Sequence, residues 1–349
     1  MAAPETPPFL AACRREPVPY TPVWLMRQAG RYMPEYRAVR ERLGFLELCH
    51  DPDAAAEVTV TAAARLGVDA AIIFADILLV LEPMGAGVEF PAGDGPRIRR
   101  PVRAAADVER LRAVEPGALD FVGAAIGRAR RALPANVPLI GFAGAPFTLA
   151  SYLIEGGASH AFTRTRAFML ADPGAWDALM ERLVASVAAY LRMQIASGAA
   201  AVQLFDSWVG CLAPADYRAH VLPHVRALIG ALPAGVPVIH FATGSAGLLE
   251  AMRAAGGDVI GLDWRVDLDA AWARVGHDVA VQGNLDPAAL LAPIPEIRRR
   301  AAAILGQAAG RPGHVFNLGH GVLPQTPVDH VRALVDAVHE LSASARHAG

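Results

Sequence analysis

Lysine is absent from this chain of 349 residues, so arginine carries every basic side-chain charge. The 32 basic residues are balanced by 34 acidic ones, which gives a net charge of −2 at pH 7. Surfaces that bind nucleic acid carry a clear excess of positive charge. The balance argues against a nucleic-acid partner, and the arginines must be interpreted by their positions and not by their number.

Cysteine is scarce: Cys13, Cys49 and Cys211 are scattered, and no CxxC pair occurs. A small, odd and dispersed set argues against a disulfide framework and against a zinc site built from cysteines. The HExxH motif of zinc proteases is missing as well. We therefore predict a protein that needs no metal and works in a reducing compartment, the cytoplasm.

Long apolar runs are also missing, and without 18 uncharged apolar residues in a row we expect no transmembrane helix. Residues 1–9 lack the basic segment and apolar core of a secretory signal. We expect a loose N-terminal arm over residues 1–17 and one catalytic domain over residues 18–345. The apolar fraction of 54% is enough for a single large core.

Short apolar runs, by contrast, recur along the chain and alternate with helical patterns. Uniformly apolar runs are typical of parallel strands buried under helices. Eight strands are expected, at residues 23–26, 70–75, 138–142, 201–205, 237–241, 259–262, 279–282 and 314–318. Eight strand–helix units predict a (β/α)8 TIM barrel, with an insertion after the second strand at residues 77–133. A doubly wound open sheet is the alternative, but it would require a glycine-rich phosphate turn such as GxGxxG, and none occurs.

Polar residues follow most of these strands, where a barrel would gather them at one mouth. Arg27 and Arg31 follow the first strand and Asp76 follows the second. Two guanidiniums beside a buried strand need anionic partners, and few acids lie near them in the sequence. Other strand ends supply Tyr152, Asp206, Ser207, His240, Asp263, Trp264, Asp286 and His320.

Each candidate also has a structural interpretation. Asp76, Asp206 and Asp286 can cap turns or helices, and Asp286 before a proline favours the cap. His240 inside an apolar strand favours a hydrogen-bonded core histidine, and Tyr152 lies on an apolar helix. A hydrolase using Ser207, His320 and Asp76 is a further possibility, but no GxSxG elbow supports it.

Several segments together resemble the uroporphyrinogen decarboxylase family. The similarity spans roughly residues 19–339 in unbroken order, and the first segment is the most specific. These segments are MRQAGRY at residues 26–32, IIFADIL at 72–78, GFAGAPFTL at 141–149, QLFDS at 203–207, GLDW at 261–264, QGNLDP at 282–287 and NLGHG at 317–321. One position departs from many relatives, which carry serine where this chain has Ala75.

The resemblance implies a cofactor-free carboxy-lyase of haem and tetrapyrrole biosynthesis, usually a homodimer. It would remove CO₂ from the four acetate side chains of uroporphyrinogen III to give coproporphyrinogen III, with the substrate pyrrole as the electron sink. The catalytic residues implied are Asp76, Arg27, Arg31 and Tyr152. Substrate contacts implied are Arg27, Gln28, Ala29, Gly30, Arg31, Asp76, Tyr152, Ser207 and His320.

Two other classes stay open. Related barrels include zinc-dependent corrinoid methyltransferases with a His-x-Cys ligand pair, but the comparable place here is HFA at residues 240–242. A non-catalytic tetrapyrrole carrier would need the arginines but not Asp76. Activity on uroporphyrinogen without added metal distinguishes the three classes.

Overall fold

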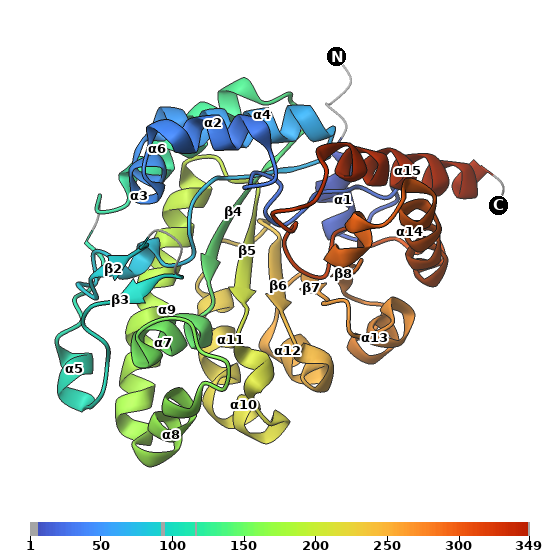
Figure 1. Ribbon diagram of the computed structural model, residues 1–349. Coiled ribbons are helices and arrows are strands. Elements are labelled where there is room, and N and C mark those ends of the chain that lie inside the picture. The colour runs from blue at the N-terminus through green and yellow to red at the C-terminus, as the bar shows by residue number, and fades with distance from the viewer. Residues whose placement is uncertain (1–5, 92–94, 116, 348–349) are drawn as a thin grey trace.

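The computed structural model describes residues 6–91, 95–115 and 117–347, and its centre is a curled parallel sheet (Figure 1). The seven strands of this sheet run in the order β1-β4-β5-β6-β7-β8-β9, and each pairs in parallel with the next. They are β1 (Ala71–Ile72), β4 (Leu139–Gly144), β5 (Ala201–Asp206), β6 (Val238–Ala242), β7 (Val259–Gly261), β8 (Ala280–Gln282) and β9 (His314–Val315).

Helices follow the strands and surround the sheet, so the strands are buried under them (Figure 1). Several begin with a proline in the first turn, where its missing N–H costs nothing, and Asp51 and Asp172 cap two of them. The helices are α2 (Pro34–Arg42), α3 (Phe45–His50), α4 (Pro52–Leu66), α6 (Asp120–Ala132), α7 (Pro146–Glu155), α8 (Thr163–Ala171), α9 (Pro173–Ala196), α10 (Pro214–His220), α11 (Leu222–Gly230), α12 (Leu249–Ala255), α13 (Leu268–Val275), α14 (Ile294–Ala308) and α15 (Val328–His347).

The segment at residues 22–24 lies between the two edges of the curled sheet. On one side, Val23 forms a parallel bridge with Phe316, just after β9, and the Phe316 N–H donates to the Pro22 carbonyl over 2.8 Å. On the other side, the N–H of Asp69, just before β1, donates to the Val23 carbonyl over 2.8 Å. The first expected strand is therefore present as a single bridge, and it joins β9 to the β1 end of the chain.

Polar side chains on the concave side of the curled sheet are hydrogen-bonded to one another across strands that are not neighbours. The indole N–H of Trp24 donates to Gln282 Oε1 over 2.8 Å, and Gln282 Nε2 donates to Gln203 Oε1 over 2.9 Å. Gln282 lies in β8 and Gln203 in β5, with β6 and β7 between them in the sheet. All three side chains are buried, so the space enclosed by the strands is filled at this level.

The expected loose N-terminal arm is wrong within the described residues 6–17. Helix α1 (Pro8–Cys13) forms there and packs on β8 and β9. Phe9, Ala12 and Cys13 are buried, because this short helix presents one apolar face to the strands. Residues 1–5 lie outside the described part of the chain.

Between β1 and β4, the expected insertion contains the 3₁₀ turn η1 (Leu79–Leu81), the antiparallel pair β2 (Val88–Glu89) and β3 (Arg97–Ile98), and α5 (Ala105–Glu109). Helix α6, also in the expected range, packs on α4 and β4 and so takes the ordinary place of a helix between two parallel strands. In the described part of the chain, no helix is both long and apolar enough to cross a membrane.

At the end of the sheet where the strands begin, Asp69 joins three parts of the chain. Its carboxylate accepts hydrogen bonds from the Tyr20 hydroxyl at 3.0 Å and the Val23 N–H at 2.7 Å, and Oδ2 lies 2.7 Å from His339 Nε2. His339 belongs to α15, so this cluster ties the C-terminal helix to the first strand segment. We call Tyr20, Val23, Asp69 and His339 the seam.

Candidate active site

The opposite end of the sheet, where the strands end, we call the mouth; α7, α10 and α12 lie at this end in Figure 1. The turn that carries Arg27 is docked there onto the loop after β9. Met26 N–H donates to Asn317 Oδ1 over 3.1 Å, and Val322 N–H donates to the Met26 carbonyl over 2.9 Å. The backbone of Arg27 has a left-handed φ of 61°, which residues other than glycine rarely adopt. The turn therefore holds Arg27 at the mouth against a conformational cost.

Two glycines of the NLGHG segment explain how His320 is positioned. A Cβ at Gly319 would lie 2.2 Å from the Trp264 backbone nitrogen, and one at Gly321 would lie 2.4 Å from Arg27 Cδ. Only glycine fits at position 319, where backbone atoms stand in the way, and a side chain at position 321 would displace the Arg27 side chain, so the loop lies directly against both neighbours. His320 lies between these two contacts, and its ring meets the Trp264 ring edge-on with centroids 6.2 Å apart.

The side chain of Asp76 follows β1 and is partly buried. Its Oδ1 accepts the Leu78 N–H over 2.8 Å, so the capping interpretation is correct for one oxygen. The other oxygen has no hydrogen-bond partner among the described residues. Burial raises the Asp76 pKa to about 6, opposed by the Leu78 N–H and by the charge of Arg27. The carboxylate is thus largely ionised at neutral pH and open on one side.

Tyr152 and Ser207 come from the next two strand ends. Helix α7 begins directly after β4 and carries Tyr152, whose ring packs on Trp208 with centroids 5.9 Å apart. Burial and the nearby charge of Asp76 raise the Tyr152 pKa to about 12, so the phenol keeps its proton. Ser207 follows β5, is partly exposed, and its carbonyl accepts the Thr243 hydroxyl.

Three of these side chains lie close enough to Arg27 to feel its charge. The positive charge of Arg27 acts on the pKa of Asp76, of Tyr152 and of His320. For His320, burial is the largest effect, and together with the charges of Arg27 and Arg265 it lowers the pKa to about 4. His320 Nδ1 accepts the Gly321 N–H over 2.8 Å, so in the neutral ring the proton lies on Nε2.

The structure places the other expected contacts less centrally. Gln28 is fully buried; its Oε1 accepts the Leu25 N–H and its Nε2 donates to the Ala70 carbonyl. Both ends of the Gln28 side chain therefore bond within the fold, and the predicted substrate contact of Gln28 stays a prediction that only its backbone can meet without breaking these bonds. Ala29 and Gly30 are partly exposed in the same turn, and Arg31 is exposed.

Asp206 deserves a larger role than the turn cap expected from the sequence. It is fully buried, Thr148 donates its hydroxyl to Oδ1 over 2.8 Å, and Oδ2 has no partner in the described part of the chain. The Thr148 hydroxyl oxygen in turn accepts the Trp208 N–H over 3.2 Å. Burial raises the Asp206 pKa to about 7. The hydrogen bonds from Thr148 to Asp206 and from Trp208 to Thr148 fix the turn around Ser207. The only sequence signal for them was a threonine in the first turn of the predicted helix after the strand.

The remaining candidates are structural. Asp286 accepts the Ala288 N–H and caps a 3₁₀ turn, as expected. His240 is fully buried, and burial lowers its pKa to about 4, which agrees with a neutral core histidine. No group of three His, Cys, Asp or Glu side chains that could hold a metal ion occurs among the described residues.

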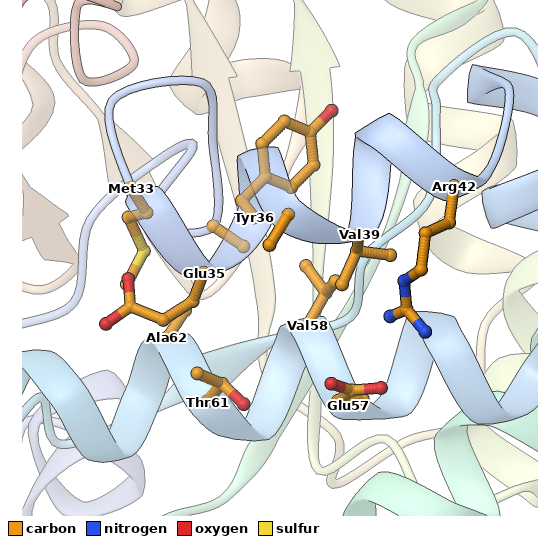
Figure 2. A pocket seen from close by; sticks show the side chains of 11 residues that line it. Met33, Glu35, Tyr36, Val39, Arg42, Glu57, Val58, Thr61 and Ala62 are labelled. Atoms are coloured by element: carbon orange, nitrogen blue, oxygen red, sulfur yellow. The ribbon is translucent and has the colours of Figure 1, made fainter.

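A separate cavity of about 230 Å³ lies between α2 and α4, on the outside of the sheet (Figure 2). Met33, Tyr36, Val39 and Val58 give it apolar walls, with Glu35, Glu57 and Arg42 at its edge. Among the expected substrate contacts, it is lined only by Ala29. The cavity therefore lies behind the Arg27 turn and is distinct from the mouth.

A curled parallel sheet with a carboxylate, a phenol, an imidazole and guanidiniums at its strand ends is the architecture of an α/β enzyme whose site lies at the carboxyl ends of the strands. The model of the family "Uroporphyrinogen decarboxylase (URO-D)" matches residues 4–341. The chain belongs to the uroporphyrinogen decarboxylase family.

Curated relatives agree over nearly the whole length. The uroporphyrinogen decarboxylase of Sorangium cellulosum is 58% identical over 335 residues, which cover 95% of this chain and 96% of the relative. That of Roseiflexus sp. is 58% identical over 342 residues, covering 96% and 98%. Among solved structures, a methyltransferase from Methanosarcina mazei superposes with a TM-score of 0.74 at 20% identity, covering 95% of this chain and 97% of that one. At that identity the likeness concerns the fold alone.

Proposed function

We propose that the mouth removes CO₂ from the four acetate side chains of uroporphyrinogen III and yields coproporphyrinogen III, without a cofactor. The observation that carries this proposal is Asp76, an ionised carboxylate with one open oxygen, beside Arg27. The substrate combines four central N–H donors with eight peripheral carboxylates. Asp76 offers acceptors for the centre, and arginines offer paired donors for the periphery.

Asp76 accepts the pyrrole N–H groups and holds the flexible macrocycle by its middle. In each round, a pyrrole ring takes up a proton and becomes a cation. The electrons of the bond between the acetate methylene and its carboxylate then flow into that ring, and CO₂ leaves. A second proton adds to the methylene carbon as the ring gives up the first, so the acetate becomes a methyl group with net uptake of one proton. The ring cation lies over Asp76, whose negative charge stabilises it.

Arg27 and Arg31 bind substrate carboxylates through their planar forks. The hydroxyl groups of Tyr152 and Ser207 donate hydrogen bonds to substrate carboxylates, and neutral His320 donates a hydrogen bond from Nε2. Arginine is a poor acid because its pKa lies above about 12, so neither arginine is assigned as the proton donor. Ala29 and Gly30 contribute backbone to the same turn.

The fold completes the proposal. Because residues 22–24 are hydrogen-bonded toward both sheet edges, we infer a closed (β/α)8 barrel over residues 18–345, with an insertion from η1 through α5. The family resemblance further supports a homodimer that works in the cytoplasm.

The test is anaerobic incubation with uroporphyrinogen III after dialysis against a strong chelator. We expect stepwise loss of four carboxylates at an unchanged rate. A rate lost on dialysis and restored by zinc would favour the methyltransferase class. Tight binding without CO₂ release would favour a carrier.

A further inference from the structure

Arg265 is a guanidinium at the mouth with no role so far. It follows β7 and Trp264, and buried Asp263 holds it: the Arg265 N–H donates to Oδ1 and its Nη1 donates to Oδ2, each over 2.9 Å. Its Cζ also lies 3.9 Å from the centroid of the Trp264 ring, a cation–π contact. The guanidinium is therefore fixed at one edge and on one face.

This fixed group still offers donors to a ligand. The Arg265 side chain is 51% exposed, whereas Asp263 is 1% exposed. Within the described residues, Nε and Nη2 of Arg265 have no hydrogen-bond partner. A side chain that is already ordered loses little entropy when it binds, so its remaining donors favour a ligand more than those of a mobile arginine would.

The position of Arg265 indicates which part of a ligand it meets. Its charge acts on His320, which Trp264 contacts edge-on. The charges that act on Asp76 are instead those of Arg27 and Glu82. Arg265 therefore belongs to the outer rim of the mouth on the His320 side, while Arg27 is close to Asp76.

We propose that Arg265 binds a propionate of the tetrapyrrole, a carboxylate that the reaction does not remove; this inference rests on the proposed function. The acetate that is being lost must lie near the ring cation over Asp76. A propionate is one methylene longer and reaches farther from the macrocycle, which suits an arginine at the rim. Arg265 thus recognises the propionate, a group that the substrate and the product both carry.

The experiment compares Arg265→Gln with the wild-type enzyme on both ligands. It measures kcat and KM for the first decarboxylation of uroporphyrinogen III, and the Kd of coproporphyrinogen III by anaerobic equilibrium dialysis. Loss of one charge-assisted hydrogen-bonded contact predicts about a tenfold rise in both KM and product Kd, with kcat unchanged. Arg265→Lys keeps the charge but not the fork, so it should show a smaller rise in both.

The matched control is Arg299→Gln on α14, an exposed arginine that pairs with Glu296 away from the strand ends. It should leave both constants unchanged. A rise in KM without a rise in product Kd would overturn the propionate assignment, because product lacks only the acetates. Unchanged constants in folded Arg265→Gln, or a fall in kcat alone, would overturn the proposal altogether. If wild-type enzyme releases no CO₂, the proposed function fails instead; if Arg265→Gln does not fold, Arg265→Lys decides.

Discussion

The seam and the mouth lie at opposite ends of the same strands, yet they treat buried polar groups differently. At the seam, Asp69 meets a hydroxyl, a backbone N–H and an imidazole, and every contact joins segments distant in sequence. At the mouth, Asp76 is only partly buried, and one of its oxygens has no partner among the described residues. Unpaired buried groups cost stability. The mouth therefore keeps hydrogen-bonding capacity for a ligand, and the seam uses the same chemistry to hold the fold together.

The largest expected effect is on turnover at the mouth. Asp76→Asn keeps the shape and the cap to Leu78 but loses the charge under the ring cation. It should fold normally and lose at least about a hundredfold in kcat, the scale for removal of one preorganised electrostatic group. The measurement is anaerobic turnover of uroporphyrinogen beside a melting curve.

Oxidised uroporphyrin is the matching control on the ligand side. It is planar, has two inner N–H groups, and its aromatic ring resists the protonation that creates the electron sink. It should not react with the wild-type enzyme. Near-normal turnover by Asp76→Asn, or equal rates on both macrocycles, would remove Asp76 from the mechanism.

Next in size is the effect on stability at the seam. Asp69→Ala leaves the Tyr20 hydroxyl and the Val23 N–H without their acceptor in a buried place. It should lower the free energy of unfolding by about 3 kcal/mol, while kcat per folded molecule stays unchanged. Denaturant unfolding and active-site titration measure the two quantities. A large fall in kcat with little loss of stability in Asp69→Ala would mean that the seam serves catalysis and not only the stability of the fold.

A smaller effect is expected for the arginines of the first turn. Arg27→Lys and Arg31→Lys keep a positive charge but lose the planar fork. We expect KM to rise about tenfold for Arg27→Lys, whose charge acts on Asp76, Tyr152 and His320, and less for Arg31→Lys, with melting temperatures nearly unchanged. Unfolding as the main result would mean that these arginines serve the structure.

The smallest expected effect is a pH dependence. The Asp76 pKa is about 6, and the carboxylate is the active form. As the pH falls through this value Asp76 takes up a proton, so kcat/KM should drop to about half its plateau near pH 6 and continue downward. His320, with a pKa of about 4, stays neutral in this window. The same fall in kcat/KM near pH 6 should be seen in Asp206→Asn, because the Asp206 carboxyl lies outside the reaction. If the fall is absent from Asp206→Asn, the titrating group is Asp206 and not Asp76.

Much of the fold followed from local patterns, because buried parallel strands are uniformly apolar and helices start at recognisable caps such as Asp51 and Asp172. The first strand was found by its apolar residues, although only Val23 forms a bridge. Helix α1 was missed because six residues carry too short a pattern, and its burial depends on β8 and β9, which are distant in sequence.

The candidate site divides in the same way. Arg27, Asp76 and His320 could be found because each follows a strand. The buried bonds of the Gln28 side chain to Leu25 and Ala70 could not be predicted, since these partners meet it only after folding. Arg265 was overlooked because nothing in the sequence shows that Asp263 and Trp264 fix its guanidinium and leave it half exposed.

The hydrogen-bonded chain Trp24–Gln282–Gln203 has a kinetic consequence. Its three buried side chains fill the inside of the curled sheet below the mouth, so in the proposed barrel a ligand enters and leaves by the mouth. A macrocycle that has lost one acetate must rotate within the site, or dissociate and bind again, before the next acetate reaches Asp76. Substrate and product therefore pass through the same opening and cannot occupy it at the same time. Coproporphyrinogen should therefore inhibit competitively, and partly decarboxylated intermediates should accumulate in solution when substrate is abundant.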